Sequence, residues 1–278
     1  MPGILYLVPT PIGNLGDISQ RCRETLESAD FIAAEDTRVT LKLLNHLRIK
    51  KSLVSYYEHN KAVKGEKIVD RILAGETCAL VSDAGSPAIS DPGEDLVKQC
   101  AEAGVTVCAI PGPCAAVTAL SISGQSTGRF CFEGFLSTAK KSRREHLEAL
   151  REERRTMIFY EAPHKLLTTL SDMSEVFGSE RPISLCRELT KLHEEVVRTT
   201  LGQAVDKYTE TPPKGEFVLI VAGAPEMKKE AATEADAAAR VAQLMADGVS
   251  RKDAVKQAAA ELGLPKNVVY DIALKTPE

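Results

Sequence analysis

The sequence lacks tryptophan, and aromatic residues make up only 5% of its 278 positions. It also lacks any apolar run near the roughly 18–20 residues that a membrane-spanning helix needs. The first residues carry neither the basic flank nor the small-residue cleavage site of a secretory signal. These absences exclude the membrane-spanning class. We expect a cytoplasmic protein with no membrane partner.

Closely spaced cysteine pairs are missing as well. The seven cysteines are an odd number and include no C-x-x-C pair, whereas disulfide frameworks and zinc sites need closer spacing. Several lie in apolar, strand-like segments such as "TCALVSD" (77–83), where cysteine behaves as a small hydrophobe. We therefore expect buried, reduced thiols and no metal site.

A phosphate-binding motif is also absent where an α/β protein would carry one. The segment "ILYLVPTPIGNLGD" (4–17) breaks from a strand-like run into a turn, but it has only Gly13 and Gly16. It therefore matches neither G-x-G-x-x-G nor G-x-x-x-x-G-K-[ST]. Pro9 and Pro11 further remove the N–H donors that a phosphate cradle uses. The segment predicts a stiff ligand-binding loop at a strand end.

Strand and helix patterns alternate through the first part of the chain, which predicts an α/β fold with a buried parallel sheet. The expected strands are 4–8, 31–35, 52–57, 77–83 and 105–112. The expected helices are 19–29, 38–47, 60–74, 93–103 and 114–124. The polar stretch 123–129 then marks a boundary.

The pattern changes after that boundary. Two strand-like segments, 182–189 and 194–201, follow each other without a full helix between them, which predicts a mixed sheet in an α+β second lobe. Glycines and a Ser250 cap divide the last residues into three short helices, a helix-turn-helix-like pattern. We expect four parts: lobes 1–122 and 123–223, a linker 224–237 and a helical appendage 238–278.

Several loops at strand ends are candidate binding sites. "VSDAGSPAISDPGEDLV" (81–97) is longer than an ordinary connection, so we expect Asp83 and the adjoining "AGSP" to contact a ligand. We expect Asp91 and Asp95 to cap the next helix instead. His164 is placed at a helix N-terminus, where a capping or substrate-orienting role is favoured over that of a base.

Charge is unevenly distributed around a net value of −4. Residues 36–67 hold eight Lys or Arg against three acidic residues, and residues 140–155 hold seven against four. Such segments either contact a phosphate backbone or form solvated helix faces. Charge alone favours the second reading.

Six motifs in chain order resemble the bacterial ribosomal RNA small-subunit methyltransferase I family of the tetrapyrrole-methylase superfamily. They are "PTPIGNLGD", "AEDTR", "SDAGSPAISDPG", "YEAPHKL", "RELTKLHEE" and "KGEFVLIVAG". The resemblance implies a bilobal class III methyltransferase fold and a homodimer. It also implies methyl transfer from S-adenosylmethionine to the 2′-hydroxyl of a cytidine in 16S rRNA, at position 1402 of the 30S decoding centre.

The resemblance also suggests where the cofactor and the RNA bind. Cofactor contacts carried onto this sequence are Pro9, Ser82, Asp83, Ser86, Ile89, Cys114, Ala115, Tyr160, Glu161, Ala162, Glu188 and Phe217. Polar residues that follow strand ends are the catalytic candidates: Asp36, Arg38, His59 and Lys191. We place Glu35 near them at the mouth of the cleft.

Two other functions compete with this one. A methylase of the same fold could act on a tetrapyrrole or on a modified protein histidine, as in a diphthine-type enzyme. The basic segment 36–67 and the helical appendage argue against it, because a small macrocycle needs neither. A non-catalytic nucleic-acid-binding protein would leave the strand-end loops without a purpose.

Overall fold

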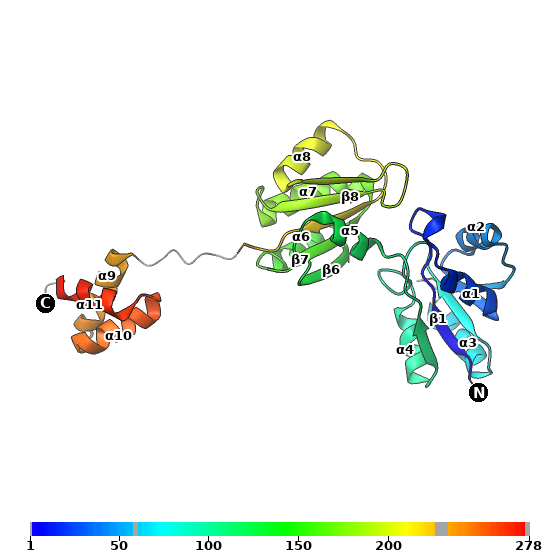
Figure 1. The fold of residues 1–278 in the computed structure, drawn as a ribbon, viewed down its shortest axis with the longest axis horizontal. Helices are drawn as coiled ribbons and strands as arrows, with labels where there is room; N and C mark the ends of the chain where they lie inside the picture. The colour runs from blue at the N-terminus through cyan, green and yellow to red at the C-terminus, as the bar shows by residue number, and fades with distance from the viewer. Residues whose placement is uncertain (1, 58–60, 226–232, 276–278) are drawn as a thin grey trace. The chain divides into compact units, whose positions relative to one another are not determined.

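The computed structural model describes residues 2–57, 61–225 and 233–275. It divides into two compact units, residues 1–224 and 225–278. Figure 1 shows the helices and strands of each unit. The larger unit contains two five-stranded sheets.

The first sheet is wholly parallel, in the order β3-β2-β4-β1-β5. Its strands are β1 (Ile4–Leu7), β2 (Phe31–Ala34), β3 (Ser52–Ser55), β4 (Cys78–Val81) and β5 (Thr106–Ala109). The connecting elements are the short 3₁₀ turn η1 (Leu15–Asp17) and helices α1 (Gln20–Ser28), α2 (Thr37–Leu47), α3 (Lys61–Leu73) and α4 (Glu94–Glu102). The expected parallel sheet is confirmed.

Helices cover both faces of this sheet, which explains why its strands are so apolar. In β2, Ile32 and Ala34 pack with residues of α1 and α2, whereas Phe31 and Ala33 pack with residues of α3 and α4. Successive strand side chains point to opposite faces, so a strand buried on both faces needs a continuous apolar run. This layering leaves the carboxyl ends of the strands as the edge that can hold a ligand.

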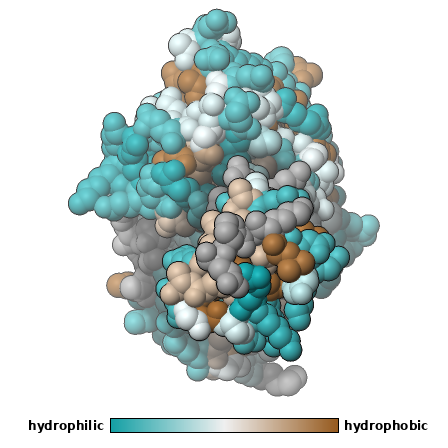
Figure 2. All heavy atoms as spheres, turned by 90° about the vertical axis from the view of Figure 1, so that its left-hand side faces the viewer, coloured by the Kyte–Doolittle hydropathy of each residue, from teal (hydrophilic) through white to brown (hydrophobic). Residues whose placement is uncertain are grey.

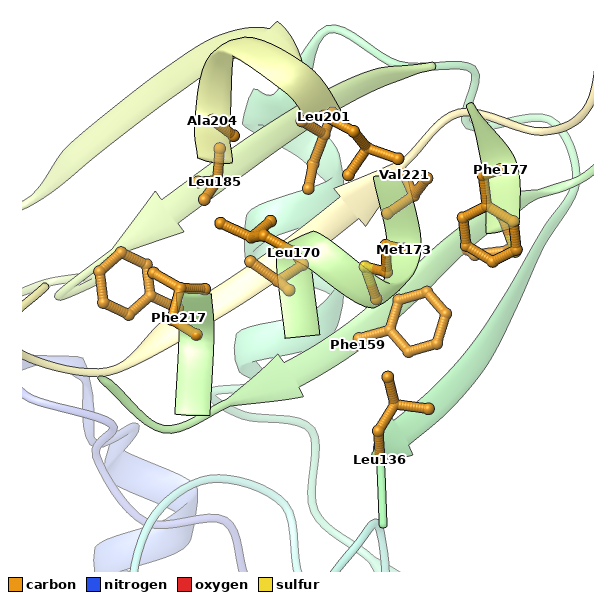
Figure 3. Packing of buried hydrophobic residues seen from close by; sticks show 14 of the residues in the cluster. Leu136, Phe159, Leu170, Met173, Phe177, Leu185, Leu201, Ala204, Phe217 and Val221 are labelled. Carbon is orange, nitrogen blue, oxygen red and sulfur yellow. The ribbon is translucent and has the colours of Figure 1, made fainter. Parts of the chain in front are cut away.

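The second sheet is mixed, in the order β6-β7-β10-β8-β9, with only β6 and β7 parallel. Its strands are β6 (Phe130–Phe135), β7 (Thr156–Glu161), β8 (Pro182–Arg187), β9 (Glu195–Thr200) and β10 (Phe217–Val221). The expected mixed sheet is confirmed. Helices α6 (Lys140–Ala149), α7 (Pro163–Phe177) and α8 (Leu201–Glu210) cover one face. Figure 3 shows Phe159, Leu170, Met173 and Leu185 interlocked there.

Helix α5 (Ala115–Ser123) follows the last strand of the first sheet but packs on the second. Its residues Ala116, Ala119 and Leu120 share a cluster with Ile158 and Ile220 of β7 and β10. It ends at Gly124, as expected from the sequence, with φ at +79°. The lobe boundary at 122/123 stays a prediction.

The smaller unit consists of α9 (Glu234–Ala246), α10 (Arg251–Leu262) and α11 (Lys266–Lys275) around a core of its own. Thr233 and Asp236 form a capping box, so α9 begins within the stretch expected to be a linker. The expected Ser250 cap is confirmed: its hydroxyl accepts the Asp253 N–H. The capped, packed helices explain how so short a segment folds.

None of the described helices is both long and apolar enough to cross a membrane. Figure 2 shows a mainly hydrophilic face on which hydrophobic residues lie in small groups. Scattered apolar residues are ordinary on protein surfaces, so this face by itself marks no binding site.

Candidate functional site

A cavity of about 600 Å³ lies where the strand-end loops of the first sheet meet the second sheet. Most of the expected cofactor contacts line it: Asp83, Ser86, Ile89, Cys114, Ala115, Tyr160, Glu161, Ala162 and Phe217. Ser82 lies beneath this lining and is 2% exposed. Pro9 lines a separate hollow of about 360 Å³. Their roles as cofactor contacts stay predictions.

The two first-lobe loops are joined by main-chain hydrogen bonds. The Thr10 N–H donates to the Gly85 carbonyl at 2.9 Å, and the Gly85 N–H donates to the Thr10 carbonyl at 3.0 Å. The Thr10 hydroxyl also donates to the Ser82 carbonyl at 3.2 Å. Because protein groups use its N–H, Thr10 cannot offer that donor to a ligand. Ile12, two residues further on, reaches the cavity.

Three carboxylates form the acidic wall of the cavity: Glu35, Asp83 and Asp91. Burial raises the pKa of Asp91 to about 6, and the nearby Asp83 charge adds to the rise despite a Ser82 hydrogen bond. Burial, followed by the Asp83 and Asp91 charges, also raises the pKa of Glu35. Asp83 accepts the Asp36 N–H at 3.1 Å, but burial still raises its pKa.

Asp91 was expected to cap α4, and this expectation is wrong. The N-cap of α4 is Gly93, with φ at +147° and no side-chain hydrogen bond. Asp91 therefore precedes the capping position and lies in the cavity wall. Pro92 and Gly93 both precede the first helical residue, Glu94, although a proline after an aspartate is typical of an Asp N-cap followed by proline at the first helical position.

The second-lobe wall is built around Tyr160 at the end of β7. Its hydroxyl accepts the Ala116 N–H at 3.1 Å, and burial raises its pKa to about 12. The rings of Phe132 and Phe135 meet it edge-on at 5.1 and 5.4 Å. These contacts hold the start of α5 against the aromatic wall. Cys114, the N-cap of α5, makes no side-chain capping bond.

Glu161 is buried in the same wall and is hydrogen-bonded to two neighbours. Its two carboxylate oxygens accept the Ala162 N–H at 2.8 Å and the Thr169 hydroxyl at 2.6 Å. This arrangement fixes the first turn of α7. His164 lies in that turn, as expected from the sequence, and lines the cavity.

Lys191 is held between two carboxylates beside the cavity. Its Nζ donates to Glu188 Oε1 at 2.9 Å and to Glu216 Oε2 at 2.7 Å. Burial opposes protonation, but the hydrogen bonds to Glu216 and Glu188 outweigh it and raise the pKa of Lys191. Lys191 is therefore a cation. Glu188 lies behind Glu216, which lines the cavity.

The loop that carries Lys191 also contacts the first lobe. A Cβ added to Gly13 would lie 2.5 Å from Lys191 Cγ and 3.1 Å from the Leu189 carbonyl. The motifs "PIGN" and "RELTK", far apart in the sequence, therefore pack together, and only a glycine permits this approach.

Two further catalytic candidates that the structure describes, Asp36 and Arg38, do not line the cavity. Asp36 caps α2, and its carboxylate accepts hydrogen bonds from the Arg38 N–H and guanidinium. The Arg38 side-chain hydrogen bond lowers the pKa of Asp36 to about 2. Neighbouring Glu35 reaches the cavity in their place. His59 lies outside the described residues.

The described part of the chain contains no group of three His, Cys, Asp or Glu side chains arranged to hold a metal ion. The cavity also shows what sequence reasoning missed. Phe135, Glu216 and Leu189 line it although none of them was among the predicted site residues. Leu189 and Glu216 lie within two of the motifs, but the sequence does not show which motif residues face the other lobe.

Comparisons with known proteins place the chain in a family. Residues 4–205 match the family described as Tetrapyrrole (Corrin/Porphyrin) Methylases, and residues 231–276 match the RsmI C-terminal HTH domain. Two relatives carry the name "Ribosomal RNA small subunit methyltransferase I". The one from Synechocystis sp. is 48% identical over 98% of both chains. The one from Halalkalibacterium halodurans is 50% identical over 97% of this chain and 94% of its own.

Solved structures share the fold at low identity. Uroporphyrin-III-C-methyltransferase from Thermus thermophilus matches 78% of this chain and 94% of its own with a TM-score of 0.56 and 19% identity. A diphthine synthase matches 79% of this chain and 90% of its own with a TM-score of 0.63 and 13% identity. The expected bilobal tetrapyrrole-methylase fold is thereby confirmed. The two relatives named above are 48–50% identical to this chain along nearly its full length. The chain therefore belongs to the ribosomal RNA small subunit methyltransferase I family.

Proposed function

We propose that this protein transfers a methyl group from S-adenosylmethionine to the ribose 2′-hydroxyl of a cytidine in 16S rRNA. Family membership supports the general part of this proposal, namely that the chain is an rRNA methyltransferase that uses S-adenosylmethionine. The observation that supports it is the match of relatives with that name along 97–98% of this chain, helical unit included. The cytidine at the decoding centre, the 2′-hydroxyl, the 30S subunit, a homodimer and a cytoplasmic location are our proposals.

The cavity suits S-adenosylmethionine in size and in charge. Its volume of about 600 Å³ is within the range of about 300–1,000 Å³ typical of small-molecule sites. The described lining includes carboxylates but neither lysine nor arginine. The cofactor carries a positive sulfonium and an ammonium group, so Glu35, Asp83 and Asp91 supply the complementary charge. A uroporphyrin-III C-methyltransferase of the same fold, 15% identical, has been solved in complex with S-adenosyl homocysteine.

We assign the cofactor contacts to the predicted residues that reach the cavity. Ser86 and Ile89 offer the first-lobe side, while Cys114, Ala115 and Tyr160–Ala162 offer the second-lobe side. When bound, S-adenosylmethionine supplies a methyl group on a positively charged sulfur, which makes its carbon electrophilic. The chain then needs to exclude water and orient the ribose hydroxyl, because such positioning supplies much of the rate.

The ribose hydroxyl must lose its proton as the new O–C bond forms and the S–C bond breaks. Asp91 is the proton acceptor that the cavity favours, since a carboxylate titrating near pH 6 is a better base than an ordinary one. Lys191, already protonated, assists through its charge. Asp36 and Arg38, outside the lining, act on the RNA beyond the target nucleotide.

Methylation with labelled cofactor tests the proposal. Under-methylated 30S subunits, naked 16S RNA and a tetrapyrrole are offered separately, and labelled RNA is digested to identify 2′-O-methylcytidine. We expect label in RNA alone. Label in the tetrapyrrole would support the alternative methylase. Cofactor binding without any transfer, or none at all, would support a non-catalytic RNA-binding protein.

A further inference from the structure

Another hollow, of about 560 Å³, lies at the other end of the second sheet from the active-site cavity. Phe130 of β6 pairs with Thr156 of β7, and Arg129 and Arg155, which line the hollow, directly precede them. The active-site cavity lies at the opposite, carboxyl ends of β6 and β7, where Phe135 and Tyr160 line it. About five residues at ~3.3 Å each separate the two places by roughly 17 Å.

Positive charge in the hollow is only partly neutralised. Glu153 is committed to Arg155: its carboxylate accepts the Arg155 Nε at 2.9 Å and Nη2 at 2.7 Å. Arg129 and Arg154 line the same hollow and are exposed, and within the described chain neither side chain has a hydrogen-bond or ion-pair partner. Arg151, nearby in the chain, is instead paired with Glu148. Two forked donors are thus available to an anion.

The hollow also lies where the chain leaves the larger unit. The Ala224 N–H donates to the Glu153 carbonyl at 2.6 Å. A Cβ on Gly223 would lie 1.9 Å from the Arg154 carbonyl, so only glycine allows the strand to pass so closely. Residue 224 is the last of the larger unit, so the segment that leads to the helical unit starts at this hollow.

We propose that the Arg129–Arg154 hollow binds phosphate groups of the RNA strand whose target nucleotide occupies the active-site cavity. The inference rests on the proposed function, which makes the ligand RNA. A guanidinium fork matches phosphate oxygens, and phosphate contacts set the register of a nucleic acid without reading its sequence. Because phosphates of one strand advance only about 3.4 Å per nucleotide along a B-DNA duplex, and a few ångströms more in an extended single strand, roughly 17 Å requires several nucleotides. A macrocycle or single nucleotide could not span both places.

The test measures binding of the full-length protein to a single-stranded 16S rRNA fragment that contains the target cytidine, without cofactor, over a series of salt concentrations. The double variant Arg129→Ala/Arg154→Ala should lose about tenfold or more in affinity. Its salt slope should fall by about 1.4, because each phosphate neutralised on a single strand contributes about 0.7. Arg21→Ala/Arg23→Ala is the matched control: both residues are exposed on α1, and the same charge is removed. The control should keep the wild-type slope.

Glu152→Gln gives a change in the opposite direction, since it removes an acid from the hollow and should tighten RNA binding. An unchanged slope in the double variant, or an equal fall in the control, overturns the proposal. The proposal is also overturned if the double variant loses binding of inorganic phosphate but keeps the wild-type affinity for RNA, because the hollow would then be a small-anion site. Cofactor binding, measured by calorimetry, should stay at the wild-type level in each variant. Failure of the wild type to methylate RNA would contradict the proposed function. The salt slope would still test the RNA-binding site, because it is measured by binding and not by methylation.

Discussion

The main-chain groups of Thr10 and Gly85 pair with each other across 75 residues of sequence, at 2.9 and 3.0 Å. This two-bond bridge joins the loop after β1 to the loop after β4. It gives the Thr10 N–H, which lies between the two prolines of the first loop, a partner in the neighbouring loop, so this donor is not available to a phosphate. The loop therefore acts as a wall of the cavity.

Gly85→Ala should weaken both the fold and cofactor binding. Gly85 has φ at +85°, and an added Cβ would meet Ile12 Cγ2 at 3.3 Å. We expect a loss of about 1–3 kcal/mol in the free energy of unfolding and a weaker affinity for S-adenosylmethionine, measured by urea denaturation and calorimetry. Gly104→Ala is the control, because φ is +71° there but no atom lies within 4 Å. Equal cofactor affinities in the two variants would contradict the role of the bridge.

Asp91→Asn should stabilise the cofactor-free protein and inactivate it. The folded-state pKa of Asp91 is about 6, above the value of about 3.9 in an unfolded chain. The folded state therefore binds the proton more tightly, and stability falls as pH rises from about 4 to about 6. Above pH 6 the free energy of unfolding of the variant should therefore exceed that of the wild type by about 1 kcal/mol, after allowing for solvent screening. Urea denaturation at pH 5 and pH 8 checks it, with Asp206→Asn as the surface control.

The pH dependence of the methylation rate should reflect the same carboxylate. The single-turnover rate of the wild type should rise through about pH 6 as Asp91 loses its proton. Asp83→Asn should move this inflection to lower pH, because the Asp83 charge helps to raise the pKa of Asp91. Asp91→Asn should lower the rate by about 10²–10⁴. A variant that keeps the wild-type rate and inflection would exclude Asp91 as the base.

Lys191→Arg should retain most of the methylation rate, whereas Lys191→Gln should lose it. The contacts with Glu188 and Glu216 keep Lys191 protonated, so its charge matters rather than its basicity. In the Gln variant the Glu188 pKa, which the Lys191 hydrogen bond lowers, should rise. Titration of Glu188 by NMR measures this rise. If Arg and Gln were equally inactive, a base role for Lys191 would be restored.

The buried ion pair of the second lobe should be a larger stability determinant than the surface pairs. Arg143 Nε lies 2.7 Å from Asp172 Oδ2, and both side chains are at most 8% exposed. Asp172→Ala leaves a buried guanidinium unpaired and should cost about 3–5 kcal/mol. Glu148→Ala, which breaks the exposed pair with Arg151, should cost less than about 1 kcal/mol. Comparable urea midpoints for the two variants would contradict this ranking.

Local sequence determined the elements. Apolar runs such as 31–35 and 77–83 have the length and composition of strands buried on both faces, and Ser250, Gly124 and Gly263 mark helix ends through their own backbone chemistry. The close succession of 182–189 and 194–201 left no room for a crossover helix, which forced an antiparallel pair. These features depend on neighbours within a few positions, so pattern reasoning reached them.

Only the tertiary structure decided which residues meet. Asp91, a candidate helix cap by spacing, lies in the cavity wall because Gly93 takes the N-cap position of α4, and burial there raises the pKa of Asp91. Helix α5 leaves the sheet it follows and packs on the other, which carries Cys114 and Ala115 to the aromatic wall. The approach of Gly13 to Lys191 spans nearly 180 positions. Such contacts depend on how the two sheets pack together. Burial of a polar side chain and contact between distant segments produce no periodic pattern in the sequence, so the sequence alone could not predict them.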